Sequence, residues 1–232
     1  MEEKYQEENV IESNYHTLFI EDLPDRFEHI EDDDNSNLYL RFSGTRKYTL
    51  YLGDFEADNQ KENFKIFSKL SEAHSDDELT IRISSIGGSF MEVVEFYNII
   101  KSKFKEITTV LNYGYSGGSL IFLAGDIRAV YEHSDFMAHT YSGGVFGKRQ
   151  DMIDQAMHQD KAITSFFKKM YSPYFSKKEL KQMHKGKEFW LDSKEMLERG
   201  IATHIITDKG EVLEAKEYLD SKKSKKSKKK EL

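Results

Sequence analysis

The chain has 232 residues, of which 38% are hydrophobic and 13% aromatic, and it contains only two prolines. This composition suits one globular domain with a full core and is unlike that of a disordered chain. The sequence has no cysteine, which excludes disulfides, thiolate metal sites and a cysteine nucleophile. No apolar run is long enough to cross a bilayer, and the first ten residues are acidic rather than signal-like. We therefore expect a cytoplasmic protein with no membrane partner.

The formal net charge of −7 is unevenly distributed along the chain. Residues 221–232 contain seven lysines and one glutamate, for a local charge of +6, so the remainder carries −13. An acidic body with a basic end is not typical of a nucleic-acid-binding domain. The lysine-rich end is predicted to be a solvated, disordered tail, with an electrostatic tether to an acidic partner or to nucleic acid as the alternative.

Hydrophobic periodicity predicts an alternation of strands and helices. Residues 1–46 carry acidic clusters and one apolar stretch (15–23), and we expect a peripheral extension with a loop at 31–34. Two capping boxes, at Ser176 and Asp192, predict the starts of late helices, and Gly200 ends the second of them. Strands are predicted at 48–52, 79–83, 107–111, 127–131 and 136–140, and helices at 63–73, 91–104, 120–124 and 150–171. This alternation is typical of an α/β fold.

The segment Gly114-Tyr-Ser116-Gly-Gly118 lies between a predicted strand and an apolar helix. A serine there presents its hydroxyl at a helix N-terminus, where amides and the helix dipole favour developing negative charge. The flanking glycines permit a tight turn and close approach of a substrate. The segment also fits the G-x-S-x-G elbow of α/β-hydrolases, although that fold places its histidine late in the chain, after the acid. The alternative is a serine that only caps the helix.

Two further motifs follow predicted strands. His139 ends the apolar run Phe136-Met-Ala-His139 and precedes a glycine-rich loop, 142–147, that is suited to line a substrate groove. Ser85-Ile-Gly-Gly88 also ends a strand, and its paired glycines expose backbone N–H groups to a ligand. Taken singly, the first is more often a structural histidine and the second a plain strand-to-helix turn.

In order and spacing, these motifs resemble those of the Clp peptidase family, the proteolytic subunits of ATP-dependent Clp proteases. The resemblance runs from about Tyr48 to Ile206 and implies a single α/β domain of the Clp-peptidase and crotonase type, a spiral of ββα units. It divides the chain into a divergent N-terminal extension (1–46), a peptidase domain (47–210) and a helix end with the lysine-rich tail (211–232). The matching segments are 85–88 for the SPGG turn, 113–125 for the nucleophile turn and its helix, 137–147 for the histidine segment, and 187–201 for the final motif.

The resemblance implies a role for each site residue. Ser116 is the expected nucleophile, His139 the general base and acid, and Glu188 the acid of the triad; the amides of Gly88 and Gly117 form the oxyanion hole. Counting back from Ala124-Gly125 selects Ser116 over Ser119. Asp192 is a rival acid but is better placed to cap a helix, and Asp135 lies too close to His139 along the same strand. No metal or organic cofactor is implied.

The sequence departs from the family pattern at several positions. Ile86 replaces the proline of SPGG, and Tyr115 replaces a small residue before the nucleophile, where it would crowd the site or shape a pocket. The family's N-terminal axial loop and first helix are not visible in residues 1–46. Thr80 and Arg82 occupy aromatic positions that help dock an AAA+ ATPase, and arginine disfavours docking of an apolar loop. The peptidase chemistry thus looks better preserved than the ATPase interface, as in a specialised, phage-type member.

We therefore expect a serine endopeptidase that cleaves unfolded or flexible polypeptides within a homo-oligomeric ring. By resemblance the ring is a heptamer or a stack of rings, with the helix at 150–171 carrying subunit contacts. One alternative is a catalytically inactive Clp-type structural subunit. Another is a crotonase-like enzyme that processes acyl-CoA, which would use the same paired amides on a thioester without a serine nucleophile.

Overall fold

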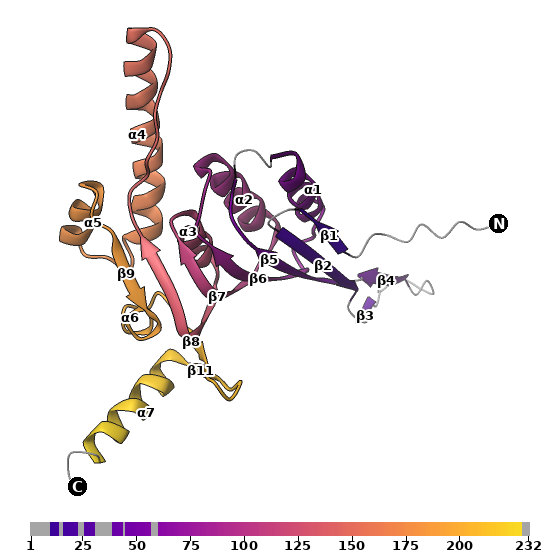
Figure 1. Cartoon of the computed structure of the whole chain (residues 1–232). Coiled ribbons are helices and arrows are strands. Elements are labelled where there is room, and N and C mark those ends of the chain that lie inside the picture. The colour runs from indigo at the N-terminus through magenta and orange to yellow at the C-terminus, as the bar shows by residue number, and fades with distance from the viewer. Residues whose placement is uncertain are drawn as a thin grey trace.

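The computed structural model describes residues 10–13, 16–22, 26–30, 39–43, 45–56 and 60–228. Within these ranges the chain forms a mixed α/β unit (Figure 1). The strands are β1 (Val10–Glu12), β2 (His16–Asp22), β3 (Arg26–Ile30), β4 (Tyr39–Ser43), β5 (Arg46–Leu52), β6 (Glu78–Ser85), β7 (Ile107–Tyr115), β8 (Ile127–Ala138), β9 (Phe189–Asp192), β10 (His204–Ile206) and β11 (Val212–Glu214). The helices are α1 (Gln60–Ser71), α2 (Phe90–Lys103), α3 (Gly117–Ala124), α4 (Arg149–Tyr171), α5 (Lys177–His184), α6 (Ser193–Glu198) and α7 (Ala215–Lys228).

The main sheet has the strand order β1-β2-β5-β6-β7-β8-β10-β11, and β9 pairs with β8 on the side opposite β7, beyond the residues of β8 that pair with β10. Strands β5 to β8 are mutually parallel and are joined through α1, α2 and α3, which cover one face of the sheet (Figure 1). Alternate residues of β6, such as Ile81 and Ile83, are fully buried beneath these helices. Because the strands are parallel, their carboxyl ends lie at one edge, where a site can be assembled from successive connections.

The N-terminal region is more integrated than the sequence predicted. Strand β2 pairs antiparallel with β5 along its whole length, from His16 opposite Leu52 to Asp22 opposite Arg46, and Leu18 is fully buried. The expectation of a peripheral extension therefore does not hold for residues 16–22, which add an edge to the main sheet. Strands β3 and β4 form a separate hairpin. The loop predicted at 31–34 lies outside the described residues.

Two element boundaries also differ from the expectation. Strand β7 continues to Tyr115, whereas the predicted strand covered 107–111, and β8 is one strand where two short ones were predicted. The pairing of β7 with β8 shifts register between Leu111 and Tyr113. Ser134 bridges this irregularity, because its hydroxyl donates to the Leu111 carbonyl and accepts the Tyr131 N–H. A side chain of β8 itself thus satisfies the backbone where the ladder is interrupted.

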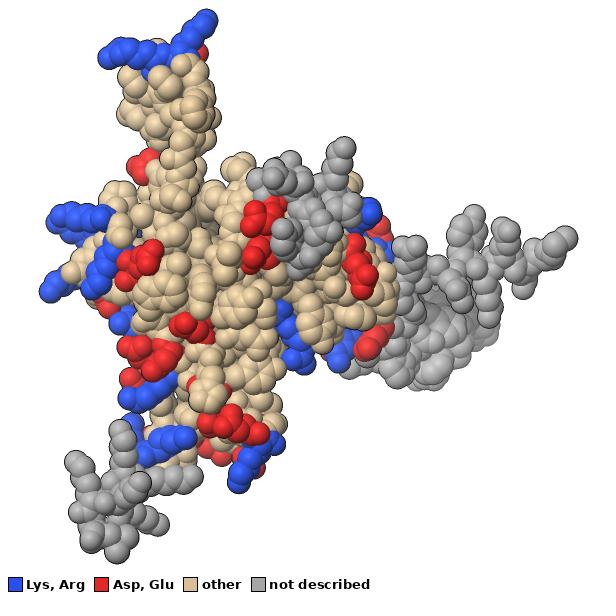
Figure 2. Space-filling view, viewed as in Figure 1, with Lys and Arg blue, Asp and Glu red and all other residues tan. Residues whose placement is uncertain are grey.

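Helix α4 projects from the body, and the segment that follows β8 runs beside it (Figure 1). We call residues 140–165 the arm. Tyr141 joins its two halves by donating a hydrogen bond to Asp160 at 2.9 Å. Of the residues of α4, only Met170 and Tyr171 are buried, and both lie at its end in the body. In Figure 2 the flank of the arm is mainly uncharged, whereas lysine and arginine side chains gather at its tip.

The C-terminal segment contains more regular structure than the predicted disordered tail. Strand β11 and helix α7 occupy residues 212–214 and 215–228, and residues 229–232 lie outside the described part. Lysine is a good helix former, so a lysine-rich segment can continue a helix that tertiary contacts have begun. One such contact is the hydrogen bond from the Tyr218 hydroxyl to Glu132 at 3.3 Å. Among the described residues, no helix is both long and apolar enough to span a membrane.

Candidate active site

Ser116 occupies a strained turn between β7 and α3. It is the only residue other than glycine with positive φ in the described ranges, at φ 52° and ψ −118°. Such a conformation costs on the order of 1–3 kcal/mol and persists only where the surroundings fix it. The Ser116 N–H donates to the Met137 carbonyl at 3.0 Å, and its own carbonyl accepts the Leu120 N–H at 3.3 Å. The turn therefore presents the Ser116 hydroxyl at the start of a helix, as a nucleophile requires.

Ser119, the other serine of this segment, has a different environment. It is fully buried, donates to the Ser116 carbonyl at 2.7 Å, and shares a hydrogen bond with the Tyr171 hydroxyl at 2.9 Å. Burial raises the pKa of Tyr171 above its ordinary value. Ser119 thus holds the turn in place and links it to the end of α4, while Ser116 remains partly exposed.

The Ser85-Ile-Gly-Gly88 turn packs directly against the serine turn. Gly87 and Gly88 have φ of +108° and +127°, values that favour glycine. A methyl group on Gly87 would lie 2.7 Å from Cβ of Ser116, and one on Gly88 would lie 2.0 Å from the carbonyl oxygen of Phe55. Ser85 closes the turn, because its hydroxyl accepts the Gly87 N–H at 3.1 Å. A larger residue would therefore displace the Ser116 turn if placed at Gly87 and the Phe55 backbone if placed at Gly88.

The backbone N–H of Gly88 points away from Phe55. The bridge between Phe55 and Gly88 consists of Phe55 N–H to the Gly87 carbonyl (2.7 Å) and Ser89 N–H to the Phe55 carbonyl (2.6 Å). Both bonds use the neighbours of Gly88, so its own N–H points to the other side of the strand. The Gly117 N–H belongs to the first turn of α3, where amides lack intrahelical acceptors. These are two candidate donors for an oxyanion.

His139 follows the last residue of β8, next to the strand β7, after which Ser116 lies. The pairing of Tyr115 with Met137 sets this proximity. Burial lowers the pKa of His139, and the carboxylate of Glu188 offsets part of that shift by favouring the charged imidazolium. The His139 Nε2 atom is buried and has no hydrogen-bond partner within the described chain. The imidazole is therefore biased toward its neutral form, which a general base needs.

Glu188 lies immediately before β9, which pairs antiparallel with β8. The register places Ala138 opposite Phe189, so one step further along the ladder brings Glu188 opposite His139. Its Oε2 atom accepts the indole N–H of Trp190 at 3.1 Å. In the described structure neither Glu188 nor the Ser116 hydroxyl is hydrogen-bonded to His139. The three predicted residues are thus brought to neighbouring strand ends without forming the full set of triad contacts.

The rival acids have other partners. Asp192 caps α6 by accepting the Glu195 N–H at 2.8 Å, which is the capping role expected from the sequence. Asp135 accepts the Tyr115 hydroxyl at 3.0 Å. Tyr115 was expected to crowd the site or shape a pocket. In the structure its hydroxyl is bonded to Asp135 on β8, and its ring contacts that of Trp190 on β9.

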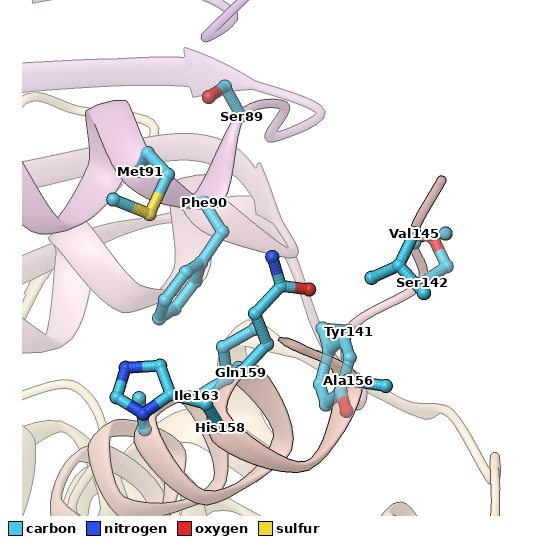
Figure 3. Close-up of a pocket in the computed structure, with 13 residues that line it drawn as sticks. Ser89, Phe90, Met91, Tyr141, Ser142, Val145, Ala156, His158, Gln159 and Ile163 are labelled. Atoms are coloured by element: carbon cyan, nitrogen blue, oxygen red, sulfur yellow. The ribbon is translucent and has the colours of Figure 1, made fainter. Parts of the chain in front are cut away.

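A cleft of about 560 Å³ lies between the start of α2 and the arm (Figure 3). The glycine-rich loop lines it, as the sequence predicted, but the inner face of α4 was not anticipated. That face is brought opposite α2 only because the chain turns back at the tip of the arm. The sequence signal that could have indicated it is the predicted helix at 150–171 directly after the glycine-rich loop. The lining residues include Ser89, Phe90, Met91, Tyr141, Val145, His158, Gln159 and Ile163.

The fold and this site define an α/β domain in which a serine turn, a histidine and two backbone amides lie at the carboxyl edge of a parallel sheet. A family model described as Clp protease matches residues 32–209. Because the match covers more than half of the chain, the protein belongs to the Clp protease family and is in general terms a Clp-type peptidase. The match begins before residue 47, at which the sequence placed the start of the peptidase domain.

Proposed function

We propose that this protein is a serine endopeptidase with Ser116 as nucleophile, His139 as general base and acid, and Glu188 as the residue that orients His139. The observation that carries the proposal is the strained Ser116 turn, packed against the Gly87–Gly88 turn at the strand edge that also bears His139. A serine held in such a conformation beside free amide donors is typical of acyl-transfer sites.

The chemistry follows from these positions. The Ser116 oxygen attacks the scissile carbonyl carbon while His139 takes the hydroxyl proton, and the carbonyl π electrons move to oxygen. The amides of Gly88 and Gly117 stabilise that oxyanion. When the C–N bond breaks, His139 gives its proton to the leaving amine, and an acyl-enzyme remains on Ser116. Water then attacks the ester with His139 again as base, which releases the carboxylic acid and restores Ser116.

The cleft supports a polypeptide substrate in an extended conformation. Its walls include Ser89, which follows Gly88, and Tyr141, two residues after His139. We expect a chain bound between these walls to extend to the Ser116 turn, which packs against the Gly87–Gly88 turn. The lining is largely apolar, with Phe90 and Val145 on opposite walls (Figure 3). An extended substrate needs free backbone groups, which folded proteins rarely offer, and this favours unfolded or flexible polypeptides.

The arm supports assembly into a homo-oligomer. Phe146 is 96% exposed and Met157 is 69% exposed, both on the projecting part of the molecule. Apolar side chains of this size on an arm with little charge along its flank are typical of subunit contacts. By resemblance we expect a ring, heptameric or stacked.

The outer face of β6 is less suited to an apolar ATPase loop. The Arg82 guanidinium lies over the ring of Tyr51, 5.9 Å from its centroid, and donates to the Tyr131 hydroxyl at 3.3 Å. Arg82 thus places a charged group on this face, and removing that group from water to bind an apolar loop is costly. We expect peptidase activity that does not depend on an AAA+ partner.

The test is labelling with a fluorophosphonate probe and cleavage of casein, with and without an added Clp ATPase. Wild-type protein should label and cleave in both conditions, and Ser116→Ala should abolish both activities. Ser119→Ala is the matched comparison: it loses the hydrogen bond to the Ser116 carbonyl and should label more slowly, but labelling should not be abolished, because the Ser116 hydroxyl is kept. An assembled wild-type protein that does not label would contradict the proposal and favour an inactive structural subunit. Thioester turnover that survives Ser116→Ala would favour the crotonase-like alternative.

A further inference from the structure

The hydrogen bond between Trp190 and Glu188 joins the proposed acid to an aromatic cluster on the sheet. Trp190 lies on β9 opposite Met137 of β8, and it is the only tryptophan in the chain. Its indole N–H donates to Oε2 of Glu188 at 3.1 Å. Tryptophan N–H is a donor only, so the bond has one direction and fixes one carboxylate oxygen.

Tyr115 braces the indole from the other side of β8. Tyr115 on β7 and Trp190 on β9 both pair with Met137, so they flank the same residue of the central strand. Their rings make an edge-to-face contact with centroids 5.0 Å apart. Tyr115 is held in turn by its 3.0 Å hydrogen bond to Asp135. A continuous set of contacts therefore runs from Asp135 through Tyr115 and Trp190 to Glu188, across three strands.

Glu188 needs such support more than a buried acid would. It is exposed, it lies just outside β9, and its side chain has three rotatable bonds. A carboxylate has two oxygens, and one bond to Oε2 leaves Oε1 free for the Nδ1–H of His139. An acid orients an imidazole only when its own position is fixed.

We propose that Trp190, braced by Tyr115, is a positioning residue that fixes the carboxylate of Glu188 for His139. This role rests on the proposed function. The proposal also gives a role to Tyr115, the bulky residue before Ser116, because Tyr115 holds the indole of Trp190 in place. The other charged groups nearby have separate partners: Asp135 accepts from Tyr115, Asp192 caps α6, and the Lys187 ammonium lies 4.8 Å from the centroid of the Phe189 ring.

The first experiment compares Trp190→Phe with wild type in the assembled protein. Phenylalanine keeps an aromatic ring beside Tyr115 and removes only the N–H donor. We expect the fluorophosphonate labelling rate to fall about 5- to 20-fold. We also expect the pH midpoint of labelling to move to lower pH, because a carboxylate that is no longer held near His139 raises the pKa of the imidazole less. Tyr113→Phe is the matched control: the Tyr113 ring lies 5.7 Å from that of Tyr115, so the variant removes a hydroxyl beside the same cluster and leaves the bond to Glu188 in place. It should leave both values unchanged.

The second experiment uses the fluorescence of the single tryptophan. Glu188→Gln replaces a charged acceptor with a neutral one, so the emission of Trp190 should change in intensity and maximum. Glu198→Gln, in a surface pair with Lys194 at 3.4 Å, should leave the emission as in wild type. Identical spectra for Glu188→Gln and wild type would show that the indole does not contact Glu188 in solution and would overturn the proposal.

The two proposals fail in different ways. If wild type labels, Ser116→Ala does not, and Trp190→Phe matches wild type in rate and pH midpoint, then Ser116 stands as the nucleophile and the positioning role is wrong. A rate loss in Trp190→Phe with an unmoved pH midpoint would indicate a merely structural role and would also overturn it. If wild type does not label, the proposed function fails and the positioning role fails with it.

Discussion

The two walls of the candidate active site are built in contrasting ways. On the body side, added methyl groups at Gly87, Gly88 and Gly117 would each meet another atom at 2.8 Å or less. On the arm side, added methyl groups at Gly143 and Gly144 would meet nothing within 4 Å. The backbone positions of the proposed nucleophile and of the proposed oxyanion donors are therefore set by the packed core of the domain. The opposing wall of the cleft is fixed by few contacts of this single chain and gains its support in the oligomer we propose.

His139 lies between the packed body of the domain and the arm. It follows the buried end of β8 and precedes the arm, and burial rather than a hydrogen bond sets its protonation. The proposed acid, Glu188, comes from a third place, just before β9, after the chain has returned from the arm. The core thus supplies the parts of the site that need a fixed backbone, whereas the proposed acid comes from a strand that joins the sheet later in the chain.

The largest expected effect is that of Gly88→Ala. Its new methyl group would lie 2.0 Å from the Phe55 carbonyl oxygen at a φ of +127°, so the backbone must shift. We expect a loss of about 3–5 kcal/mol in the free energy of unfolding and no detectable labelling. Gly144→Ala, on the open side, should stay within about 0.5 kcal/mol. Urea denaturation measures the unfolding free energy of both variants. Equal losses of unfolding free energy would show that the two walls do not differ in packing.

Glu188→Gln should reduce activity strongly and change its pH dependence. Burial lowers the pKa of His139, so the neutral base already predominates below the ordinary histidine pKa of about 6.5. Without the Glu188 charge the pKa of His139 falls further, and the rising limb of labelling against pH moves to lower pH. The plateau should drop by about 10²- to 10⁴-fold, because the imidazole loses its orienting acid. A plateau like that of wild type would show that another residue, such as Asp192, is the acid.

Tyr171→Phe should have an intermediate effect on the link between α4 and the nucleophile turn. The variant removes a fully buried hydroxyl that shares a hydrogen bond with Ser119, at a cost of about 1 kcal/mol in unfolding free energy. Labelling should slow a few-fold as the support of the Ser116 carbonyl loosens. Tyr174→Phe keeps its ring beside Arg128, 5.5 Å from the guanidinium carbon, and should be near wild type in both assays.

Phe146→Ser should have the smallest effect on the stability of the chain. This side chain is 96% exposed, so the unfolding free energy of the dissociated protein should change by no more than about 0.5 kcal/mol. Size-exclusion chromatography should nevertheless show a smaller species than wild type, since the arm carries the proposed subunit contacts. An unchanged assembly would place those contacts elsewhere.

Local signals in the sequence predicted local structure well. The capping boxes at Ser176 and Asp192 are present with both reciprocal bonds, because they depend on residues three positions apart. The strand-to-helix turn at Ser116 was predicted for the same reason. The family and the α/β fold followed from several such motifs in register, and both are confirmed.

Features that depend on distant partners were not predicted. The bulge in β8 exists because Ser134 bonds to Leu111 on another strand, and β2 joins the sheet through β5. The contact between Trp190 and Tyr115 requires the antiparallel placement of β9 beside β8, which no local pattern specifies. The roles of Ser116, His139 and Glu188 stay predictions, since their side chains are near one another but not joined by hydrogen bonds.

The late position of β9 also has a consequence for biosynthesis. Glu188 follows Ser116 by 72 residues along the chain. At about 5–20 residues per second, the ribosome adds the proposed acid roughly 4–14 seconds after the nucleophile. During that interval the serine turn and its amides have been synthesised but the strand that completes the site has not. If Glu188 is the acid that we propose, the order of the chain keeps the nascent protein inactive until this strand has been synthesised.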